Sequence, residues 1–304
     1  MAATKDSRVA IVTGGGRGIG REHALTLAER GLAVVVNDLG GDPTGSGADV
    51  TPASTVVEEI RSRGGQAVVN GGDVADFAHA EELIQTALTE FGRLDVVVNN
   101  AGILRDRTLA AMSEAEWDAV IRVHLKGTFA VSHFAAAHWR ARYKATGKPQ
   151  NARLINTTSA SGIYGNFGQS NYGAAKAGIA SLTIIAAKEL EGYGVTVNAV
   201  APVARTRLTP TLRDGVDEGT FSPVHIARVV AWLAGSSSAA ITGRVFDVWG
   251  ARIGVSEGWR IGPTASKDGI WTVDELDEVL PNLVAKAAPN STISGVPETD
   301  QVAQ

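Results

Sequence analysis

The sequence predicts an α/β protein built on a doubly wound parallel sheet, and two observations lead to this prediction. First, short runs rich in Val, Ile and Ala alternate with longer segments of helical pattern, which indicates βαβ units. Second, most of the short runs are continuously apolar, which is typical of strands buried on both faces of a parallel sheet. Right-handed crossovers between such strands leave a ligand crevice at their carboxyl ends.

The pattern places strands and helices in strict alternation along the chain. Each strand occupies a short apolar run, and each helix fills the stretch that follows it. The expected strands are residues 9–12, 33–37, 67–70, 96–99, 153–157, 195–200 and 245–248, and the expected helices lie near residues 18–30, 50–63, 76–91, 113–143, 171–191 and 225–234.

The chain changes character after the last of these strands. We expect a single domain over residues 7–256, a C-terminal extension over residues 257–288 and a mobile tail over residues 289–304. The extension carries one amphipathic helix, residues 272–287, with Asp274 and Glu275 in its first turn, where acidic groups favour the helix dipole. The tail is rich in Ser, Thr, Asn and Asp, which is typical of disorder. Residues 40–47 are glycine-rich and predict a flexible loop.

Composition argues against several classes of protein. The 304 residues are 44% hydrophobic and 20% charged, as in ordinary globular proteins. The net charge of -4 gives no general attraction to nucleic acid or an anionic membrane, and no apolar run approaches the roughly 20 residues of a membrane span. Cysteine is absent, so disulfides and thiolate sites are excluded, and we predict no metal site. With no secretory signal pattern, a cytoplasmic location is the default expectation.

A glycine-rich segment follows the first predicted strand and opens the first predicted helix. Residues 13–20 read Thr-Gly-Gly-Gly-Arg-Gly-Ile-Gly. Gly14, Gly18 and Gly20 let the chain turn tightly and let backbone amides approach a pyrophosphate at a helix N-terminus. The spacing is looser than the usual dinucleotide fingerprint, so a plain tight turn is the alternative. The position between strand and helix favours phosphate binding.

Polar and small residues follow the next three strands at the same edge of the sheet. Asp38 ends the second strand, where a carboxylate accepts hydrogen bonds from ribose hydroxyls and repels a 2′-phosphate. Arg17 is nearby and basic, so NADP is the alternative to NAD. Asp73 and Val74 follow the third strand at the height of an adenine, and residues 99–102, Asn-Asn-Ala-Gly, follow the fourth. Each alone is typical of a turn, but together they indicate one binding edge.

Ser159, Tyr172 and Lys176 are the candidate catalytic set. A helix would place Tyr172 and Lys176, four residues apart, on one face, and a nearby cation favours the phenolate of a tyrosine, whose ordinary pKa is near ~10. Ser159 would hold a substrate oxygen while the phenolate acts as general base. Two solvated helix residues are the alternative for the pair. Tyr164 is a competing phenol, but Gly168 stands where its lysine would be.

In this order, these elements resemble the short-chain dehydrogenase/reductase family over residues 7–255. The resemblance implies a Rossmann-type fold, a nicotinamide cofactor and hydride transfer at a carbonyl or alcohol carbon. It implies that Tyr172 is the catalytic acid/base and that Ser159 holds the substrate oxygen. It also implies that Lys176 lowers the pKa of the tyrosine and binds the nicotinamide ribose. The cofactor-binding positions that it implies are Gly14, Arg17, Gly18, Ile19, Gly20, Asp38, Asp73, Val74, Asn100, Ala101, Gly102, Tyr172, Lys176, Pro202 and Thr206.

Two positions depart from the family pattern. The family usually has an asparagine in the long helix before the serine strand, as a fourth catalytic residue, and His124 stands there in this chain. The family also usually has Pro-Gly after the sixth strand, where this chain has Pro202 and Val203. We keep His124 as a catalytic candidate that holds a water or donates a hydrogen bond at a helix kink. A packing histidine is the alternative.

Longer stretches are similar to one branch of the family. Residues 36–41, 99–107 and 159–169 look like the dehydrogenase part of the D-specific multifunctional enzymes of peroxisomal β-oxidation, also described as 17β-hydroxysteroid dehydrogenases, and that branch shares the Val-His-Leu around His124. This implies oxidation of a (3R)-hydroxyacyl-CoA to a 3-ketoacyl-CoA with NAD⁺, by a stand-alone relative too short to hold a hydratase domain. Residues 104–108 and 204–208 each carry two arginines that could meet a coenzyme A phosphate, or could simply be solvated.

Other functions stay open from the sequence alone. A 3-oxoacyl-thioester reductase using NADPH is one alternative, against which Asp38 argues. A hydroxysteroid dehydrogenase, or an enzyme for a steroid side-chain thioester, is another. A non-enzymatic NAD-binding protein is disfavoured by the intact catalytic set. Because the family commonly forms homotetramers, we expect a homo-oligomer, dimer or tetramer, with an acyl-CoA or steroid as its small-molecule substrate and neither nucleic acid nor membrane as partner.

Overall fold

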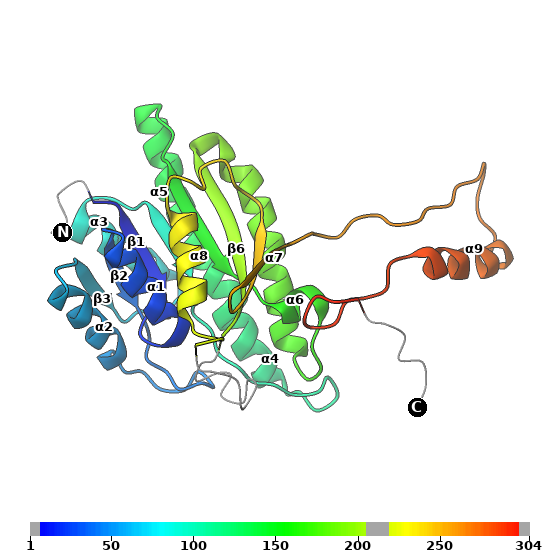
Figure 1. Ribbon diagram of the computed structural model, residues 1–304, viewed down its shortest axis with the longest axis horizontal. Helices are drawn as coiled ribbons and strands as arrows, with labels where there is room; N and C mark the ends of the chain where they lie inside the picture. The colour runs from blue at the N-terminus through cyan, green and yellow to red at the C-terminus, as the bar shows by residue number, and fades with distance from the viewer. Residues whose placement is uncertain (1–6, 205–218, 298–304) are drawn as a thin grey trace. The chain divides into compact units, whose positions relative to one another are not determined.

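The computed structural model describes residues 7–204 and 219–297, and one eight-stranded sheet lies at its centre (Figure 1). The strands are β1 (Val9–Thr13), β2 (Ala33–Asn37), β3 (Ala67–Asn70), β4 (Val96–Asn99), β5 (Ala152–Thr157), β6 (Val195–Val203), β7 (Val245–Trp249) and β8 (Arg252–Ser256). Their order is β3-β2-β1-β4-β5-β6-β7-β8. The first seven are parallel to their neighbours. The order reverses between β1 and β4, as the predicted doubly wound sheet requires.

Helices cover both faces of this sheet (Figure 1). The described helices that precede residue 257 are α1 (Gly18–Glu29), α2 (Thr51–Ser62), α3 (Phe77–Phe91), α4 (Glu114–Ile121), the π-helical η1 (Arg122–Lys126), α5 (Gly127–Thr146), α6 (Ala160–Tyr164), α7 (Ser170–Leu190), the 3₁₀ turn η2 (Glu191–Tyr193) and α8 (Val224–Ala234). A further helix, α9 (Val273–Lys286), belongs to a separate unit of the chain. One core cluster contains buried residues of α1, α2 and α8, and another those of α3, α5 and α7.

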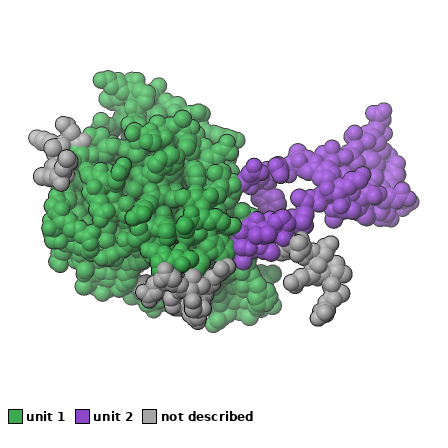
Figure 2. All heavy atoms as spheres, viewed as in Figure 1, with its two compact units in different colours: residues 1–256 green, residues 257–304 purple. Residues whose placement is uncertain are grey.

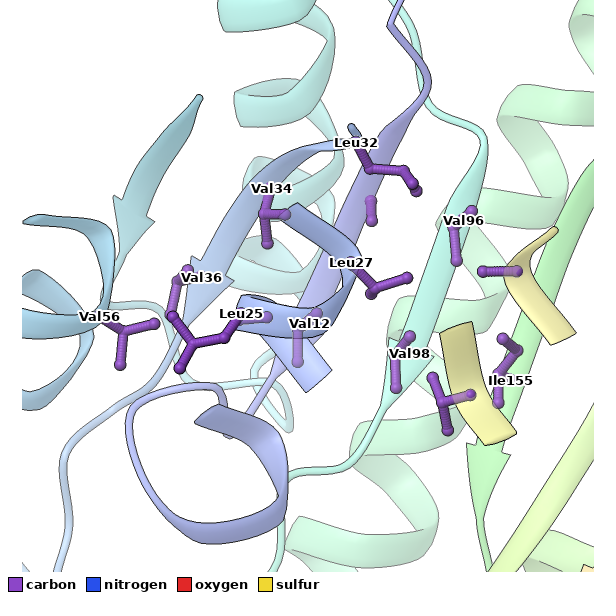
Figure 3. Packing of buried hydrophobic residues seen from close by; sticks show 14 of the residues in the cluster. Val12, Leu25, Leu27, Leu32, Val34, Val36, Val56, Val96, Val98 and Ile155 are labelled. Carbon is purple, nitrogen blue, oxygen red and sulfur yellow. The ribbon is translucent and has the colours of Figure 1, made fainter. Parts of the chain in front are cut away.

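Successive strand residues supply the two cores in turn. Ala10 and Val12 of β1 belong to the cluster beneath α1, α2 and α8 (Figure 3), whereas Val9 and Ile11 belong to the other. All five residues of β1 are buried. Two-sided burial is therefore the reason that the strands are continuously apolar in the sequence. It also directs their polar end residues to the edges of the sheet.

The eighth strand differs from the wholly parallel sheet that the sequence predicts. The chain turns back from β7 at Gly250, whose φ of 57° is in the left-handed region, and pairs Trp249 with Arg252 in an antiparallel ladder. Ile253 and Val255 of this edge strand are 59% and 53% exposed. An edge strand that is open to solvent does not need an apolar run, so the pattern that identifies the other strands misses it.

The single helix predicted over residues 113–143 is divided in the structure. A capping box of Ser113 and Glu116 starts α4, and the π-helical η1 separates α4 from α5. Such π-turns are frequent at functional sites. Because η1 contains His124, the position that departs from the family pattern lies at the irregular point of the helix. The five-residue α6 is also absent from the sequence prediction, since one turn is too short to show a period.

Residues 257–304 form a second compact unit, coloured purple in Figure 2. Its helix α9 starts with a capping box between Thr272 and Glu275, and Lys267 pairs with Glu275 at 2.6 Å. None of the residues of α9 is buried. Within the stretch that the sequence predicts as a mobile tail, Ser291 and Pro297 form an isolated bridge, while residues 298–304 lie outside the described part of the chain.

The described part of the chain shows neither a membrane-spanning helix nor a metal cluster. Within it, no helix combines the length and the apolar character needed to cross a membrane. In the same part of the chain, no group of three or more His, Asp or Glu side chains is arranged to hold a metal ion.

We predict that the buried His23 makes folding stability fall in mild acid. His23 of α1 is fully buried, and its two ring nitrogens have no partner among the described residues. Burial lowers its pKa to about 3, below its value of ~6.5 in the unfolded chain. The unfolded state therefore binds more protons once the pH falls below that value. The folded state should lose about 2 kcal/mol from this residue at pH 5.

Urea unfolding of His23→Leu at pH 8 and pH 5 checks this expectation. The variant should lose less stability between the two pH values than the wild type does. His133→Leu, at an exposed position of α5, is the control and should lose as much as the wild type. Equal acid sensitivity in all three proteins would contradict the assignment to His23.

Candidate active site

Asparagine side chains mark the carboxyl ends of four strands. Nδ2 of Asn37 at the end of β2 donates to Oδ1 of Asn70 at the end of β3, at 2.9 Å. Nδ2 of Asn99 on β4 likewise donates to Oδ1 of Asn156 on β5 at 2.9 Å, and Asn156 donates to Oγ1 of Thr183 on α7 at 3.0 Å. These buried bonds fix the strand ends to one another and to α7. The loops that follow therefore start from defined positions.

The glycine loop between β1 and α1 packs closely against the segment after β4. Nδ2 of Asn100 donates to the carbonyls of Thr13 and Gly14 at 3.1 and 3.2 Å, and Gly14 has a φ of 62°. A Cβ on Gly14 would lie 2.8 Å from Cα of Ala101, and a Cβ on Gly20 would overlap the carbonyl oxygen of Gly14. Glycine is therefore required at both positions, and the loop presents bare backbone before the N-terminus of α1. That surface fits a pyrophosphate.

Asp38 joins the glycine loop to the loop after β2. Its Oδ2 accepts a hydrogen bond from the backbone of Gly16 at 2.8 Å, and its Oδ1 accepts one from Gly40 at 2.7 Å. A carboxylate offers about four acceptor positions, so Asp38 can accept two more hydrogen bonds, as the two hydroxyls of a ribose require. Arg17 donates to the carbonyl of Gly41 at 3.2 Å. This geometry fits the adenosine half of a dinucleotide.

Asp73 and Val74, after β3, connect this edge to η1. Asp73 accepts hydrogen bonds from the backbone of Ala75 at 2.9 Å and from the guanidinium of Arg122 at 2.7 Å. Val74 is buried, and a Cβ on Gly127 would lie 2.8 Å from its Cγ2. The structure thus places both residues where the sequence expects an adenine, with the Asp73 carboxylate already engaged by Arg122.

His124 links η1 to the end of the Asn-Asn-Ala-Gly segment by hydrogen bonding. Its Nε2 lies 2.7 Å from the carbonyl oxygen and 3.0 Å from the backbone nitrogen of Ile103, and a Cβ on Gly102 would overlap the imidazole ring. Burial and the nearby charge of Lys176 lower the pKa of His124 to about 3. The ring is therefore neutral near pH 7, and its Nε2–H tautomer can donate to Ile103. Its Nδ1 has no partner among the described residues.

Ser159, Tyr172 and Lys176 come together beyond the carboxyl end of β5. Tyr172 and Lys176 lie one turn apart on α7, with Nζ 5.5 Å from the centre of the phenol ring, and Ser159 immediately precedes α6. Nζ also donates to the carbonyl of Thr157 at 2.6 Å. The ring of His124 meets that of Tyr172 edge-on, with their centres 5.1 Å apart. All four catalytic candidates therefore lie in one small region.

Loss of hydration is the largest influence on the pKa values of Tyr172 and Lys176. It raises the pKa of Tyr172 to about 12, opposed by a hydrogen bond with Ser159 and reinforced by the negative charge of Asp106. It lowers the pKa of Lys176 to about 7. The sequence predicts that Lys176 lowers the tyrosine pKa, whereas the pKa is raised here because desolvation of the phenolate is the larger effect.

Lys176 has one recorded hydrogen-bond acceptor among the described residues. Its side chain is 3% exposed and forms no ion pair with a described residue, so the carbonyl of Thr157 is the hydrogen-bond acceptor that the structure records for Nζ. An ammonium group has three donors. The remaining donors fit the hydroxyls of a nicotinamide ribose.

A set of polar bonds closes the site on the side of residues 105–107. Nε2 of Gln169 donates to Oδ2 of Asp106 at 2.9 Å, and its Oε1 accepts from Oγ of Ser161 at 2.7 Å. Nδ2 of Asn171 donates to the carbonyl of Arg105 at 2.9 Å. These bonds join the loop after β4 to α6 and α7. The sequence pattern does not predict a role for Gln169, Asn171 or Asp106, because the bonds that join the loop after β4 to α6 and α7 form only on folding.

The loop of residues 40–49, which the sequence predicts to be flexible in its glycine-rich part, carries its own hydrogen bonds. Oδ1 of Asp42 accepts from the backbone of Thr44 at 2.8 Å and of Ser46 at 3.0 Å. Pro43 accepts from the backbone of Leu104 at 3.1 Å. The loop is therefore held against the segment after β4.

The arginines predicted to meet a coenzyme A phosphate have other partners in the structure. Arg105 donates to the carbonyl of Thr44 at 2.9 Å, and Arg107 pairs with Glu116 at 3.2 Å. The second predicted pair of arginines, Arg205 and Arg207, lies outside the described residues. The predicted cofactor residue Thr206 lies outside them as well.

Two further predicted cofactor residues occupy the same edge of the sheet. Ile19 lies in the first turn of α1 and packs on the core cluster of that face. Pro202 lies near the carboxyl end of β6, opposite Val248 of β7. The structure thus brings together predicted residues from the loops after β1, β2, β3 and β4, from α7 and from β6.

This chain is similar to known proteins of one family. Residues 8–216 match the model of the short chain dehydrogenase family. The chain is 45% identical to the peroxisomal multifunctional enzyme type 2 of Mus musculus over 249 residues, which are 82% of this chain and 32% of that protein. It is 42% identical to the hydroxyacyl-CoA dehydrogenase ChsB1 of Mycobacterium tuberculosis over 299 residues, which are 94% of this chain and 92% of that protein.

A solved structure shows the same architecture. The crystal structure of a short chain dehydrogenase from Mycobacterium avium matches with a TM-score of 0.86 at 46% identity, and the match covers 98% of this chain and all of that one. The chain thus spans the full length of this structure but about a third of the length of the mouse relative.

We predict that Gly102→Ala destabilises the fold, because the new Cβ would overlap the ring of His124. Forcing extra volume into a packed site costs about 1–3 kcal/mol. Gly192→Ala is the matched control, since a Cβ there meets no atom within 4 Å and its φ is not left-handed. Urea unfolding measures both variants. A Gly102→Ala protein as stable as the control would show that His124 does not lie against Gly102.

Proposed function

The chain belongs to the short-chain dehydrogenase family and is an oxidoreductase that acts on CH–OH groups with a nicotinamide cofactor, and on this basis we propose that it interconverts a (3R)-hydroxyacyl-CoA and the corresponding 3-ketoacyl-CoA. One observation carries the reaction: the Tyr172 phenol lies between Lys176 and Ser159. The substrate class is supported by the similarity to a hydroxyacyl-CoA dehydrogenase along nearly its whole length.

Tyr172 is the group that takes the hydroxyl proton in the oxidative direction. The Ser159 hydroxyl donates a hydrogen bond to the same substrate oxygen and so fixes it beside the phenol. Lys176 contributes a positive charge near the ring, which favours the phenolate. The nicotinamide ring supplies the carbon that accepts hydride and, when oxidised, a further positive charge. General-base assistance of this kind contributes on the order of 10²–10⁴ in rate.

His124 acts as a positioning residue in this proposal. Its neutral ring bonds the backbone of Ile103 and contacts the ring of Tyr172. A ring with a pKa of about 3 is not a useful proton carrier near pH 7, because its charged form is too rare. We therefore infer that His124 sets the distance between the segment after β4 and the catalytic tyrosine.

We infer that NAD is the cofactor. One oxygen of Asp38 accepts from the backbone of Gly16 in the glycine loop and the other from that of Gly40 in the loop after β2, so the carboxylate is held where a 2′-phosphate would lie. Arg17, the nearby cation, donates to the carbonyl of Gly41. A negative charge at this position and an engaged arginine both favour a free 2′-hydroxyl.

We infer a homo-oligomer, as the family resemblance implies. Phe77 of α3 and Phe129 of α5 are 42% and 46% exposed, and their rings stack with centres 6.2 Å apart. The edge strand β8 also exposes Ile253 and Val255. Exposed apolar side chains on a helix pair and at an open sheet edge are typical of surfaces that pair with another subunit.

Location and domain limits stay predictions. The sequence favours the cytoplasm, whereas the name of the mouse relative places that protein in the peroxisome. We propose that catalysis belongs to residues 7–256, with residues 257–288 as an extension and residues 289–304 as its tail.

We predict that the protein oxidises (3R)-hydroxyacyl-CoA with NAD⁺ at least about tenfold faster than the (3S) epimer or a free hydroxysteroid. Tyr172→Phe should lower turnover by about 10²–10⁴ because the general base is lost. NADH affinity should change little. Initial rates across the three substrates and fluorescence titration with NADH measure these quantities.

Tyr164→Phe is the control for this experiment. Tyr164 is partly exposed at the end of α6 and has no lysine four residues further on, so its variant should keep most of the turnover. Near-normal rates in Tyr172→Phe would remove the tyrosine from the mechanism. Preference for the (3S) epimer would reject the proposed substrate.

We predict that Asp38→Asn weakens the selection of NAD over NADP. The variant loses the negative charge and one acceptor for a ribose hydroxyl, and a hydrogen bond to a charged group is worth about 1.5–3 kcal/mol. KM for NAD⁺ should therefore rise about tenfold or more, while KM for NADP⁺ should fall. Asp49→Asn, an exposed position on the same loop, should change neither. An unaltered ratio in Asp38→Asn would mean that another residue selects the cofactor.

A further inference from the structure

A pocket lies at the opposite edge of the sheet from the proposed active site. It encloses about 600 Å³, including its open mouth, and is lined among others by Arg8, Arg30, Trp232, Ser236 and Ser237. These residues stand at the amino end of β1 and at the C-terminal ends of α1 and α8. The twelve residues of α1, about 18 Å of helix, separate the pocket from the glycine loop.

Two arginines beside this pocket, the half-buried Arg8 and the buried Arg153, bind only backbone carbonyls among the described residues. Arg8 donates to the carbonyls of Ala234 and of Asn151, the latter at 3.1 Å. Arg153 is 2% exposed and donates to the carbonyl of Gly235 at 3.2 Å. Neither arginine forms an ion pair within the described part of the chain. Burial lowers the pKa of both guanidinium groups, so their charges are poorly compensated.

Two described carboxylates near these arginines are already engaged. Asp95, whose charge acts on Arg8, accepts two hydrogen bonds from Arg93, at 2.8 and 2.7 Å. Glu29, next to Arg30 in α1, pairs with Arg63 at 3.1 Å. Arg30 itself is exposed and has no ion-pair partner among the described residues. Neither of these two carboxylates is therefore free to compete with an anion from solution for Arg30.

The charges at this edge leave a positive surplus. Arg8, Arg30, Arg93 and Arg153 contribute four positive charges, and Asp95 contributes one negative charge. The C-terminal ends of α1 and α8 add about one further negative charge together. About two positive charges remain, in part buried. Because a buried charge without a counter-charge is costly, the pocket favours an anion.

We propose that this pocket binds a phosphorylated ligand that carries an apolar or aromatic group. The guanidinium groups of Arg8 and Arg30 match the spacing of phosphate oxygens. The hydroxyls of Ser236 and Ser237 form no hydrogen bond with another described residue and are donors for the same oxygens. Trp232 is 44% exposed and, with Leu32, supplies an apolar wall. An aromatic ring attached to the phosphate can pack on the indole.

Calorimetric titration with phenyl phosphate tests the proposal on the full chain. Saturating NADH is present throughout, so that the dinucleotide edge is occupied. We expect one saturable site, weakened about tenfold or more in Arg30→Gln, since a hydrogen bond to a charged group is lost. Arg228→Gln removes an exposed arginine of α8 that does not line the pocket, and it should bind as the wild type does.

A further variant distinguishes the contribution of the phosphate to binding from that of the aromatic ring. Trp232→Ala should abolish the advantage of phenyl phosphate over inorganic phosphate while leaving the weaker binding of inorganic phosphate intact. Circular dichroism checks that each variant is folded. Absence of saturable binding would overturn the proposal. Equal weakening by Arg30→Gln and Arg228→Gln would do so as well, because it would indicate general charge attraction.

Discussion

Burial of the central strands on both faces is the constraint on which the rest of this structure depends. Residues such as Val9 and Val12 of β1 serve opposite cores, so the middle of a strand has no room for a polar side chain that does chemistry. The asparagines that border the candidate site lie at the strand ends, where Asn37, Asn70, Asn99 and Asn156 pair across the sheet. The parallel direction of β1 to β6 then brings every following loop to one edge. The location of the active site is a consequence of how the core is packed.

Burial at that edge also explains why the pKa values of Tyr172 and Lys176 shift in opposite directions. The same enclosure that excludes water raises the pKa of the phenol and lowers that of the ammonium. Each group is therefore held in its neutral form more strongly than in water. Further positive charge would favour the phenolate of Tyr172, and further hydrogen-bond acceptors would favour the ammonium of Lys176. In the mechanism that we propose, the bound cofactor supplies both, which couples the activation of the base to the arrival of the cofactor.

Much of the fold was accessible from the sequence because it depends on local patterns. Seven apolar runs and the alternation with helices identify the sheet, and the spacing of Tyr172 and Lys176 predicts their shared helix face. The features that the sequence does not predict are missed for physical reasons. The edge strand β8 lacks an apolar run, η1 is an insertion within one helical pattern, and the bonds of Gln169 to Asp106 and Ser161 join residues brought together only by folding. Neither the raised pKa of Tyr172 nor the arginine pocket can be read from spacing, since both depend on burial.

His124 shows how a departure from a family pattern can depend on a residue that keeps the pattern. An imidazole is longer than the side chain of asparagine, and here it spans from η1 to the backbone of Ile103. It fits because residue 102 is glycine, where a Cβ would overlap the ring. The π-helical turn, the histidine and the glycine therefore form one structural unit. The edge-on contact between His124 and Tyr172 extends this unit to the catalytic helix, so a change at any of these positions should be transmitted to the position of the phenol.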